Sequence, residues 1–230
     1  MKWLSRLELK YGRYAISNLT MYIAGLNLAV VFLTYIMFGG DAGKTVSALA
    51  LVPSMVLRGQ VWRLITFIFL PDTYSLIWII FTAYLTYMIG ASIENYWGRF
   101  KLNIYFLTGI IGSIIAAFIT GLGTTGYYLN LSMFLAFATL FPEHEFLLFF
   151  VLPVKVKWLG LLNGVYILWQ LSTYIRYGAW YMAAAIVASL INYFIFFGDD
   201  FIKWIKLKRQ VAKNRKRFFE QVGPYRNRRY

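Results

Sequence analysis

The sequence has no cysteine, one histidine and few charged residues. Only 14% of its 230 residues are charged, whereas about a quarter are charged in a typical soluble domain. The absence of cysteine excludes disulfide bonds, thiolate metal sites and a cysteine nucleophile. The lone histidine, His144, stands between Glu143 and Glu145, but three neighbouring positions of one loop cannot all face one ion. We therefore expect no metal site and no cofactor.

Apolar residues dominate the chain instead: 60% of the residues are hydrophobic and 20% are aromatic. So much apolar surface cannot be buried in one core, and about 20 apolar residues are enough to cross a bilayer. We therefore predict an all-α fold, a polytopic transmembrane bundle of about six helices. The expected spans are residues 16–38, 73–93, 102–122, 127–140, 158–174 and 179–197. The apolar segment 146–152 is too short to cross and is expected at the surface.

The spans divide the chain into an amphipathic N-terminus over residues 1–15, a membrane domain over 16–199 and a basic tail over 200–230. The connection over residues 41–72 is neither a clean span nor a polar loop, because its apolar stretch is interrupted by Pro53. Such a segment is typical of an interfacial or re-entrant structure. We expect this first external loop to dip into the membrane.

The charged residues are strongly unbalanced, with 23 basic against 9 acidic side chains and a formal net charge of +14. Because the basic residues flank apolar spans, the expected partner is the lipid bilayer and not nucleic acid. They cluster before the first span, between the second and third, between the fourth and fifth, and after the sixth. The positive-inside rule then predicts that both termini are cytoplasmic. Interleaved aromatic residues in the tail favour binding to anionic lipid; they are Trp204, Phe218 and Phe219.

A Trp-Arg pair, Trp62 and Arg63, precedes the second span. An interfacial arginine can donate to loop carbonyls or to lipid phosphates, while the indole anchors in the headgroups. We expect Arg63 to brace the first external loop, with plain interfacial anchoring as the alternative. Gly109 and Ser113 are four residues apart, a spacing that lets helix backbones pack closely.

The second span ends in the pattern Gly90-x-x-x-Glu94-x-x-Trp97-Gly98. Glu94 lies at the end of a helix, close in sequence to Arg99 and Lys101. A structural ion pair with one of these two residues is the expected role of Glu94.

The Trp-Arg loop, the pattern at the end of the second span and their order resemble the rhomboid and derlin superfamily of intramembrane proteins. The resemblance extends over most of the chain and implies a rhomboid-like bundle. Residues 148–157 are similar to a loop that many bacterial rhomboid homologues carry after the fourth span. This similarity implies a bacterial plasma membrane as the location.

Active rhomboids use a serine within Gly-x-Ser-Gly near the outer end of the fourth span and a histidine in the sixth. In this sequence the matching positions hold Tyr127 and Tyr181. The two small residues that follow the histidine in the family's sixth span would match Ala184 and Ala188, which implies that the close helix packing is retained. Ser132 is a weak alternative nucleophile, because it lacks the flanking glycines. His144 is expected on the cytoplasmic side, on the order of 20 Å from the outer face, whereas proton transfer requires about 3 Å. The resemblance therefore implies a pseudoprotease.

Three hypotheses about function follow. The first is a catalytically inactive rhomboid-like protein that binds transmembrane segments of other membrane proteins. The second is an active intramembrane serine protease in which Ser132 uses some other base. The third is a small transporter or channel, which normally requires ionisable residues within its spans; the expected spans contain almost none.

Overall fold

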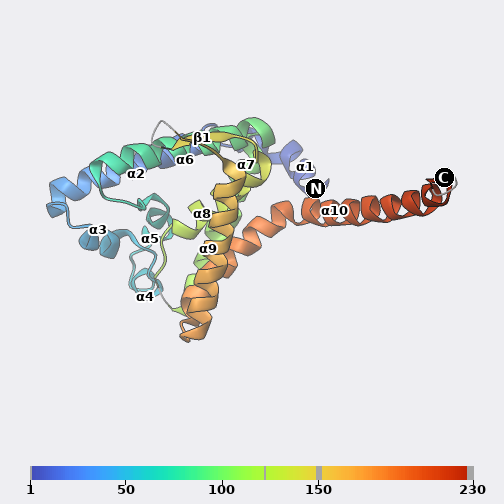
Figure 1. The fold of residues 1–230 in the computed structure, drawn as a ribbon. Helices are drawn as coiled ribbons and strands as arrows, with labels where there is room; N and C mark the ends of the chain where they lie inside the picture. The colour runs from blue at the N-terminus through green and yellow to red at the C-terminus, as the bar shows by residue number, and fades with distance from the viewer. Residues whose placement is uncertain (1, 122, 149–151, 227–230) are drawn as a thin grey trace. The chain divides into compact units, whose positions relative to one another are not determined.

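The computed structural model describes residues 2–121, 123–148 and 152–226. Within these ranges every expected span corresponds to a helix, and the predicted all-α membrane bundle is confirmed (Figure 1). These helices are α2 (Leu19–Phe38), α6 (Leu76–Trp97), α7 (Arg99–Thr120), α8 (Tyr127–Leu140), α9 (Val156–Arg176) and α10 (Trp180–Arg226). A short helix α1 (Lys2–Tyr11) and a 3-10 turn η1 (Gly12–Tyr14) precede them.

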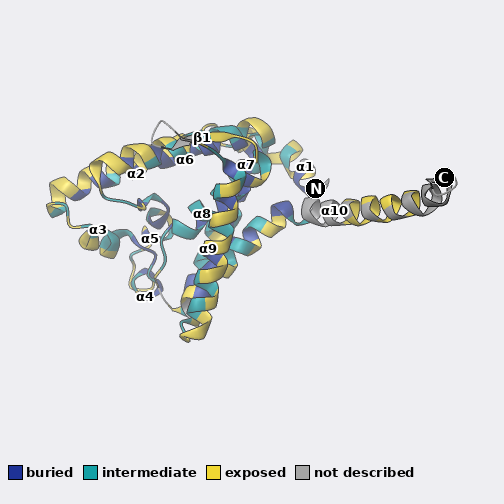
Figure 2. Ribbon diagram, viewed as in Figure 1, coloured by how far each residue is buried: buried dark blue, intermediate teal, exposed yellow. Residues whose placement is uncertain are grey.

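In the described part of the chain, α2, α6 and α7 are long and apolar enough to cross a membrane. Between 28% and 33% of the residues in their most apolar windows are buried. The rest of each helix exposes apolar side chains, as the many exposed residues along these helices in Figure 2 illustrate. Lipid is the solvent that such faces require. Helix α8 and residues 182–198 of α10 are also apolar but shorter.

The chain forms two compact units, residues 1–193 and 194–230. The first holds all elements up to α9 and the start of α10. Helix α10 ends at Arg226, whereas the sequence predicted that the sixth span would end near residue 197. Residues 199–222 contain no glycine or proline and many good helix formers, so the helix has no stop signal there. The side chains of residues 199–205, which include Trp204, and of residues 219–230, which include Phe219, lie outside the described residues.

Helices α2 and α6 lie side by side and pack closely (Figure 1). The buried residues of α2 follow a helical period along one face: Thr20, Ile23, Ala24, Asn27, Val31 and Thr34. A Cβ atom on Gly90 of α6 would lie 2.1 Å from Cγ2 of Thr20, far inside van der Waals contact. Only glycine therefore allows the two helices to approach as they do.

The junction between α6 and α7 is made by Gly98, whose φ of 85° reverses the chain between the two helices. One turn earlier, both carboxylate oxygens of Glu94 accept the backbone N–H of Asn18, each at 3.0 Å. The predicted ion pair of Glu94 with Arg99 or Lys101 is wrong, since neither pairing forms among these described residues. The N-terminal N–H groups of a helix lack backbone partners and attract negative charge, and here Glu94 meets that need for α2.

The loop over residues 41–72 folds into short helices: α3 (Ala42–Leu49), α4 (Pro53–Val56), α5 (Arg63–Thr66) and the 3-10 turn η2 (Phe67–Phe69). Leu51 and Phe67 are fully buried and give the loop a core. Leu51 also exchanges two backbone hydrogen bonds with Thr124, at 3.1 and 2.9 Å. Several of its apolar side chains are exposed, as expected of a segment that lies against lipid; they are Leu57, Val61, Trp62 and Ile65.

The segment after α8 is an antiparallel hairpin of β1 (Glu145–Leu148) and β2 (Leu152–Lys155). The sequence predicted a surface segment here but not the strands. Glu143 at the base of the hairpin binds Lys155 at 2.8 Å and Lys157 at 2.7 Å. Hydrogen bonds from these two lysines lower the pKa of Glu143 to about 2. The same carboxylate raises the pKa of Lys155 above its ordinary value.

Candidate functional site

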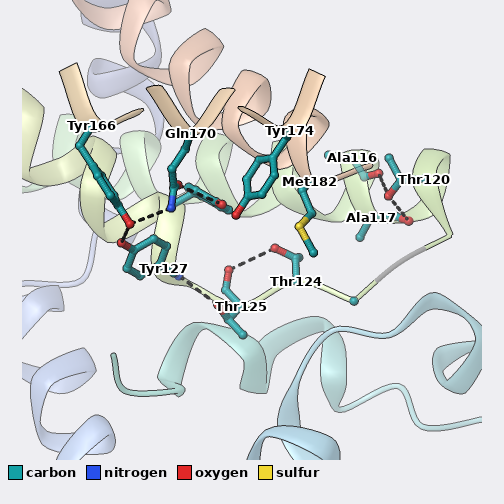
Figure 3. Close-up of a pocket in the computed structure, with 12 residues that line it drawn as sticks. Ala116, Ala117, Thr120, Thr124, Thr125, Tyr127, Tyr166, Gln170, Tyr174 and Met182 are labelled. Carbon is teal, nitrogen blue, oxygen red and sulfur yellow. Dashed lines mark hydrogen bonds between the residues drawn. The ribbon is translucent and has the colours of Figure 1, made fainter. Parts of the chain in front are cut away.

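A cavity of about 550 Å³ lies where the C-terminal end of α7 meets the first turn of α8, the second half of α9 and the start of α10 (Figure 3). Its described lining is rich in hydroxyl groups, with small apolar residues between them. The lining residues are Ala116, Ala117, Thr120, Gly123, Thr124, Thr125, Tyr127, Tyr128, Tyr166, Gln170, Tyr174 and Met182. We call this space the tyrosine cavity.

A hydrogen-bond network crosses one wall of the tyrosine cavity. The hydroxyl oxygen of Tyr166 accepts from the Tyr127 hydroxyl at 3.3 Å and from Gln170 Nε2 at 2.7 Å. The Tyr128 hydroxyl donates to Gln170 Oε1 at 3.4 Å. Tyr166 and Gln170 are four residues apart on α9, so both face α8. Since the Tyr166 oxygen accepts twice, its own proton is left to donate, and no described residue is seen to accept it.

The turn between α7 and α8 forms another wall and joins the cavity to the loop over residues 41–72. The backbone N–H of Gly126 donates to Phe67 O at 3.0 Å. A Cβ atom on Gly126 would lie 3.2 Å from Ile68 O, which explains why a small residue is needed where the turn meets η2. The next residue, Tyr127, donates its backbone N–H to Thr125 Oγ1 at 3.4 Å. Tyr127 is therefore positioned by its own bond to Thr125 and by the bond that ties the preceding Gly126 to Phe67.

The chemistry of the tyrosine cavity is that of neutral hydrogen-bonding groups. None of its described lining residues is an acid, a basic residue or a histidine. A tyrosine hydroxyl ordinarily ionises near pH 10, and a threonine hydroxyl is no base at all. The cavity can therefore bind donors and acceptors, but these lining residues cannot act as a general base at neutral pH. Tyr127 lies in this cavity, whereas the side chain of Tyr181 lies outside the described residues.

Ser132 lies outside the cavity, deep between helices, and is 2% exposed. Its hydroxyl is hydrogen-bonded to the hydroxyl of Tyr105 and donates to Ser189 O at 3.3 Å. Asn192 extends this cluster, because its Nδ2 donates to Tyr105 O at 3.2 Å and its Oδ1 accepts from Thr108 at 2.7 Å. The cluster joins α7, α8 and α10. These contacts make Ser132 part of helix packing, and none of the described residues named in this cluster is an acid, a lysine or a histidine.

His144 lies beyond the opposite end of α8 from the tyrosine cavity. The 14 residues of that helix rise by about 20 Å, so the imidazole cannot serve a group at Tyr127. Its ring packs edge-on against Phe137 at 5.7 Å and Phe146 at 5.4 Å. Among the described residues, no three His, Cys, Asp or Glu side chains are grouped as metal ligands.

Two of the small residues singled out in the sequence, Gly109 and Ala188, lie at contacts between helices. A Cβ atom on Gly109 would lie 2.3 Å from Leu129 Cδ1, so α7 and α8 approach there as closely as glycine permits. Ser113 Oγ donates back to Gly109 O at 2.9 Å. Ala188 of α10 faces Gly112 of α7. The sequence analysis did not single out Gly112. The fourth predicted packing residue, Ala184, is partly buried.

Arg63 is 5% exposed and uses three of its nitrogens. Nη1 donates to Ala50 O, Nη2 to Ser47 O and Nε to Gln60 Oε1, all at 2.7 Å. The two carbonyls lie at the C-terminal end of α3, where a cation is favourable because helix carbonyls lack partners there. The neighbouring Trp62 is 51% exposed.

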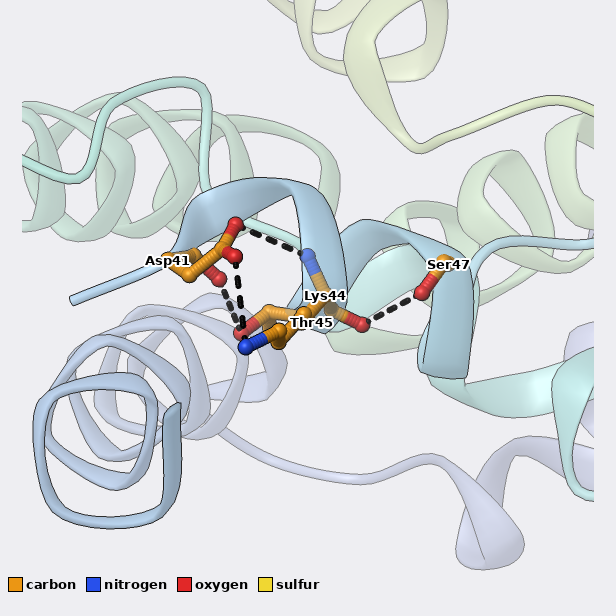
Figure 4. Close-up of polar contacts among 4 residues, drawn as sticks. All are labelled: Asp41, Lys44, Thr45 and Ser47. Atoms are coloured by element: carbon orange, nitrogen blue, oxygen red, sulfur yellow. Dashed lines mark hydrogen bonds and ion pairs between the residues drawn. The ribbon is translucent and has the colours of Figure 1, made fainter. Parts of the chain in front are cut away.

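The other end of α3 has a cap that the sequence analysis missed. Asp41 Oδ1 accepts the backbone N–H of Lys44 at 3.2 Å, and its Oδ2 lies 3.7 Å from Lys44 Nζ (Figure 4). Aspartate before a short helix is the ordinary N-cap signal. A residue at the far end was missed as well, since Thr66 Oγ1 donates to Leu49 O at 2.9 Å. Helix α3 is thus held at both ends by side chains.

Residues 24–199 match a family of eukaryotic integral membrane proteins designated DUF1751. The chain belongs to this family. No curated protein and no solved structure matches the chain. The expectation of a bacterial plasma membrane is wrong, because the family is eukaryotic. The bacterial-like segment 148–157 that suggested it overlaps the hairpin, and a short apolar hairpin carries no information about the organism.

Proposed function

We propose that this DUF1751 protein is a catalytically inactive, rhomboid-like membrane protein that binds transmembrane segments of other membrane proteins at the tyrosine cavity. The observation that carries the proposal is the position of Tyr127. It stands where the resemblance to rhomboids puts the catalytic serine, and it lines a cavity of about 550 Å³ without a described acid or base. A binding site remains there whose described lining offers hydroxyl and amide groups in place of a serine and a histidine.

The lining of the cavity suits a transmembrane partner. Apolar helices gain little by leaving lipid for an apolar protein surface, so recognition in a membrane depends on close packing and on hydrogen bonds. The cavity supplies both, through Ala116 and Ala117 on one side and Tyr166 and Gln170 on the other. The unused proton of Tyr166 would donate to a hydroxyl, an amide or a free backbone carbonyl of the bound segment. Segments with a polar residue or a helix break are the expected partners.

Photo-crosslinking in native membranes tests the proposal. A photoreactive amino acid at position 170 faces the cavity, whereas one at position 168, two residues earlier on α9, replaces a side chain that is 61% exposed on the outside. We expect position 170 to crosslink to peptides from membrane-spanning segments, and position 168 to lipid. Tyr166→Phe, which removes one hydroxyl and keeps the ring, should weaken the protein crosslinks from position 170. Lipid adducts alone at position 170 would refute the proposal.

We also propose that the tail binds anionic lipid. Within residues 194–230, the described part of α10 exposes basic and apolar side chains together. The exposed basic residues are Lys206, Arg209, Lys213, Arg215 and Arg217, and the exposed apolar ones are Leu207, Val211 and Phe218. Such a helix favours an anionic membrane surface, at about 1 kcal/mol for each basic residue near it. Flotation of the purified chain with vesicles should fall after three of these basic residues are changed to glutamine, and unchanged flotation would contradict the proposal.

A further inference from the structure

A second cavity, of about 380 Å³, lies between the start of α7 and the segment that joins α1 to α2. Its described lining is almost entirely apolar or aromatic. The lining residues are Tyr11, Tyr14, Ala15, Ile16, Leu19, Phe100, Asn103, Ile104, Phe106, Leu107 and Ile110. We call this space the N-terminal groove. It shares no lining residue with the tyrosine cavity.

The dimensions of the N-terminal groove match one acyl chain. Its α7 wall extends from Phe100 to Ile110, a rise of about 15 Å along a helix. Half of a bilayer's hydrocarbon core is also about 15 Å thick. Arg99 is exposed at the first residue of α7. Because a basic side chain beside an apolar span favours the headgroup region, the Phe100 end of this wall belongs at the polar boundary of the membrane. The groove therefore runs from that boundary along one leaflet.

The mouth of the groove carries two cations. Lys10 Nζ lies 5.1 Å from the ring centre of Tyr11, and the Arg13 guanidinium lies 4.7 Å from that of Tyr14. Arg13 Nη2 also donates to the Tyr14 hydroxyl at 2.6 Å. Because both tyrosines line the groove, these contacts hold the two charges at its edge. Both basic side chains are exposed, so Lys10 Nζ and the other nitrogens of Arg13 can meet an anion in the headgroup region.

Two acidic residues, Glu94 and Glu8, lie near the groove. Both carboxylate oxygens of Glu94 are occupied by the N–H of Asn18. Glu8 lies on α1 with its carboxylate beside Gly98, where a Cβ atom would be 3.7 Å from Glu8 Oε1. The polar lining residue of the groove, Asn103, is also in use, since it exchanges hydrogen bonds of 3.0 and 2.8 Å with the backbone of Ile16. Lys10 and Arg13 outnumber Glu8, so the net charge at the mouth is positive, and the interior is apolar.

We infer that the N-terminal groove binds one anionic glycerophospholipid, with an acyl chain along α7 and its phosphate between Lys10 and Arg13. The cations at the mouth favour a lipid with net negative charge, and the length of the apolar wall favours a full acyl chain over a short amphiphile. The bound lipid would fix α1 and η1 against α7 at the membrane boundary. This site is independent of the function proposed for the tyrosine cavity.

Native mass spectrometry of the full chain, delipidated in detergent, tests the inference. The probes are phosphatidylserine and phosphatidylcholine with identical acyl chains. We expect one phosphatidylserine to bind more tightly than phosphatidylcholine, by about fivefold for each cation at the mouth and so about 25-fold in all. Lys10→Gln with Arg13→Gln should abolish this preference. A matched control, Arg58→Gln with Arg176→Gln, removes two exposed cations away from the groove and should preserve it.

A second pair of variants tests the acyl-chain site. Ala15→Trp places an indole in the groove and should prevent binding of both lipids, whereas Ala29→Trp adds the same indole at an exposed position of α2 and should have no effect. Thermal midpoints of all variants in the same detergent show that the chain remains folded. Equal binding of the two lipids by the unchanged chain would overturn the inference. Retention of the preference after loss of Lys10 and Arg13 would overturn it as well.

Discussion

Arg63 allows the most direct test of how the loop over residues 41–72 is held. Its Nη1 bond to Ala50 O is fully buried, whereas the bonds to Ser47 O and Gln60 are partly buried. In Arg63→Ala the buried carbonyl loses its donor, which costs about 1–3 kcal/mol. The two partly buried acceptors can be hydrated again and add about 0.5 kcal/mol each. The sum is a loss of about 2–4 kcal/mol in the free energy of unfolding.

The assay is thermal unfolding of the purified chain in one detergent. For a chain of this size each kcal/mol lowers the midpoint by about 2–4 °C, so Arg63→Ala should lower it by about 5–15 °C. Arg63→Lys should recover only part of the loss, because one ammonium cannot reach three acceptors that a planar guanidinium meets together. Arg58→Ala is the matched control, since Arg58 belongs to the same loop but is exposed. A midpoint for Arg63→Ala equal to that of Arg58→Ala would refute the bracing role.

Three further predictions concern packing, charge and reactivity. Gly90→Ala should lower the thermal midpoint, because its Cβ would lie 2.1 Å from Thr20, whereas Gly25→Ala, with nothing within 4 Å, should not; equal midpoints would contradict this. The pKa of Glu143 is lowered from 4.5 to about 2, so its pairing stabilises the hairpin fully above pH 4.5 and is lost as the pH falls through about 2. The difference in midpoint between the unchanged chain and Glu143→Gln should therefore shrink below pH 4.5, and a constant difference would argue against the pairing. A fluorophosphonate probe should leave Ser132 unlabelled because that residue is 2% exposed; labelling that disappears in Ser132→Ala would show a reactive serine.

The membrane class and the helices could be predicted from the sequence because hydrophobicity along the chain is a local property. A run of about 20 apolar residues must be helical in lipid, whatever surrounds it. The boundaries near Gly98 and Pro142 followed from residues that interrupt helices. The kind of organism could not be predicted from the sequence. Segment 148–157 resembles bacterial loops, but such an apolar segment is equally compatible with a eukaryotic membrane. Local patterns also missed the hairpin, because strand pairing depends on two segments meeting.

What the tertiary structure decided was the partner of each polar side chain. Glu94 bonds to Asn18, which is 76 positions away, instead of the basic residues near it in the sequence. Ser132 is held by Tyr105 and Ser189 from two other helices, although its sequence context left open an exposed nucleophile. The periodicity of apolar residues shows which residues are removed from water, but it does not show which helices pack against each other. Buried polar groups must find partners wherever the packing brings them, and that packing also creates the tyrosine cavity and the N-terminal groove.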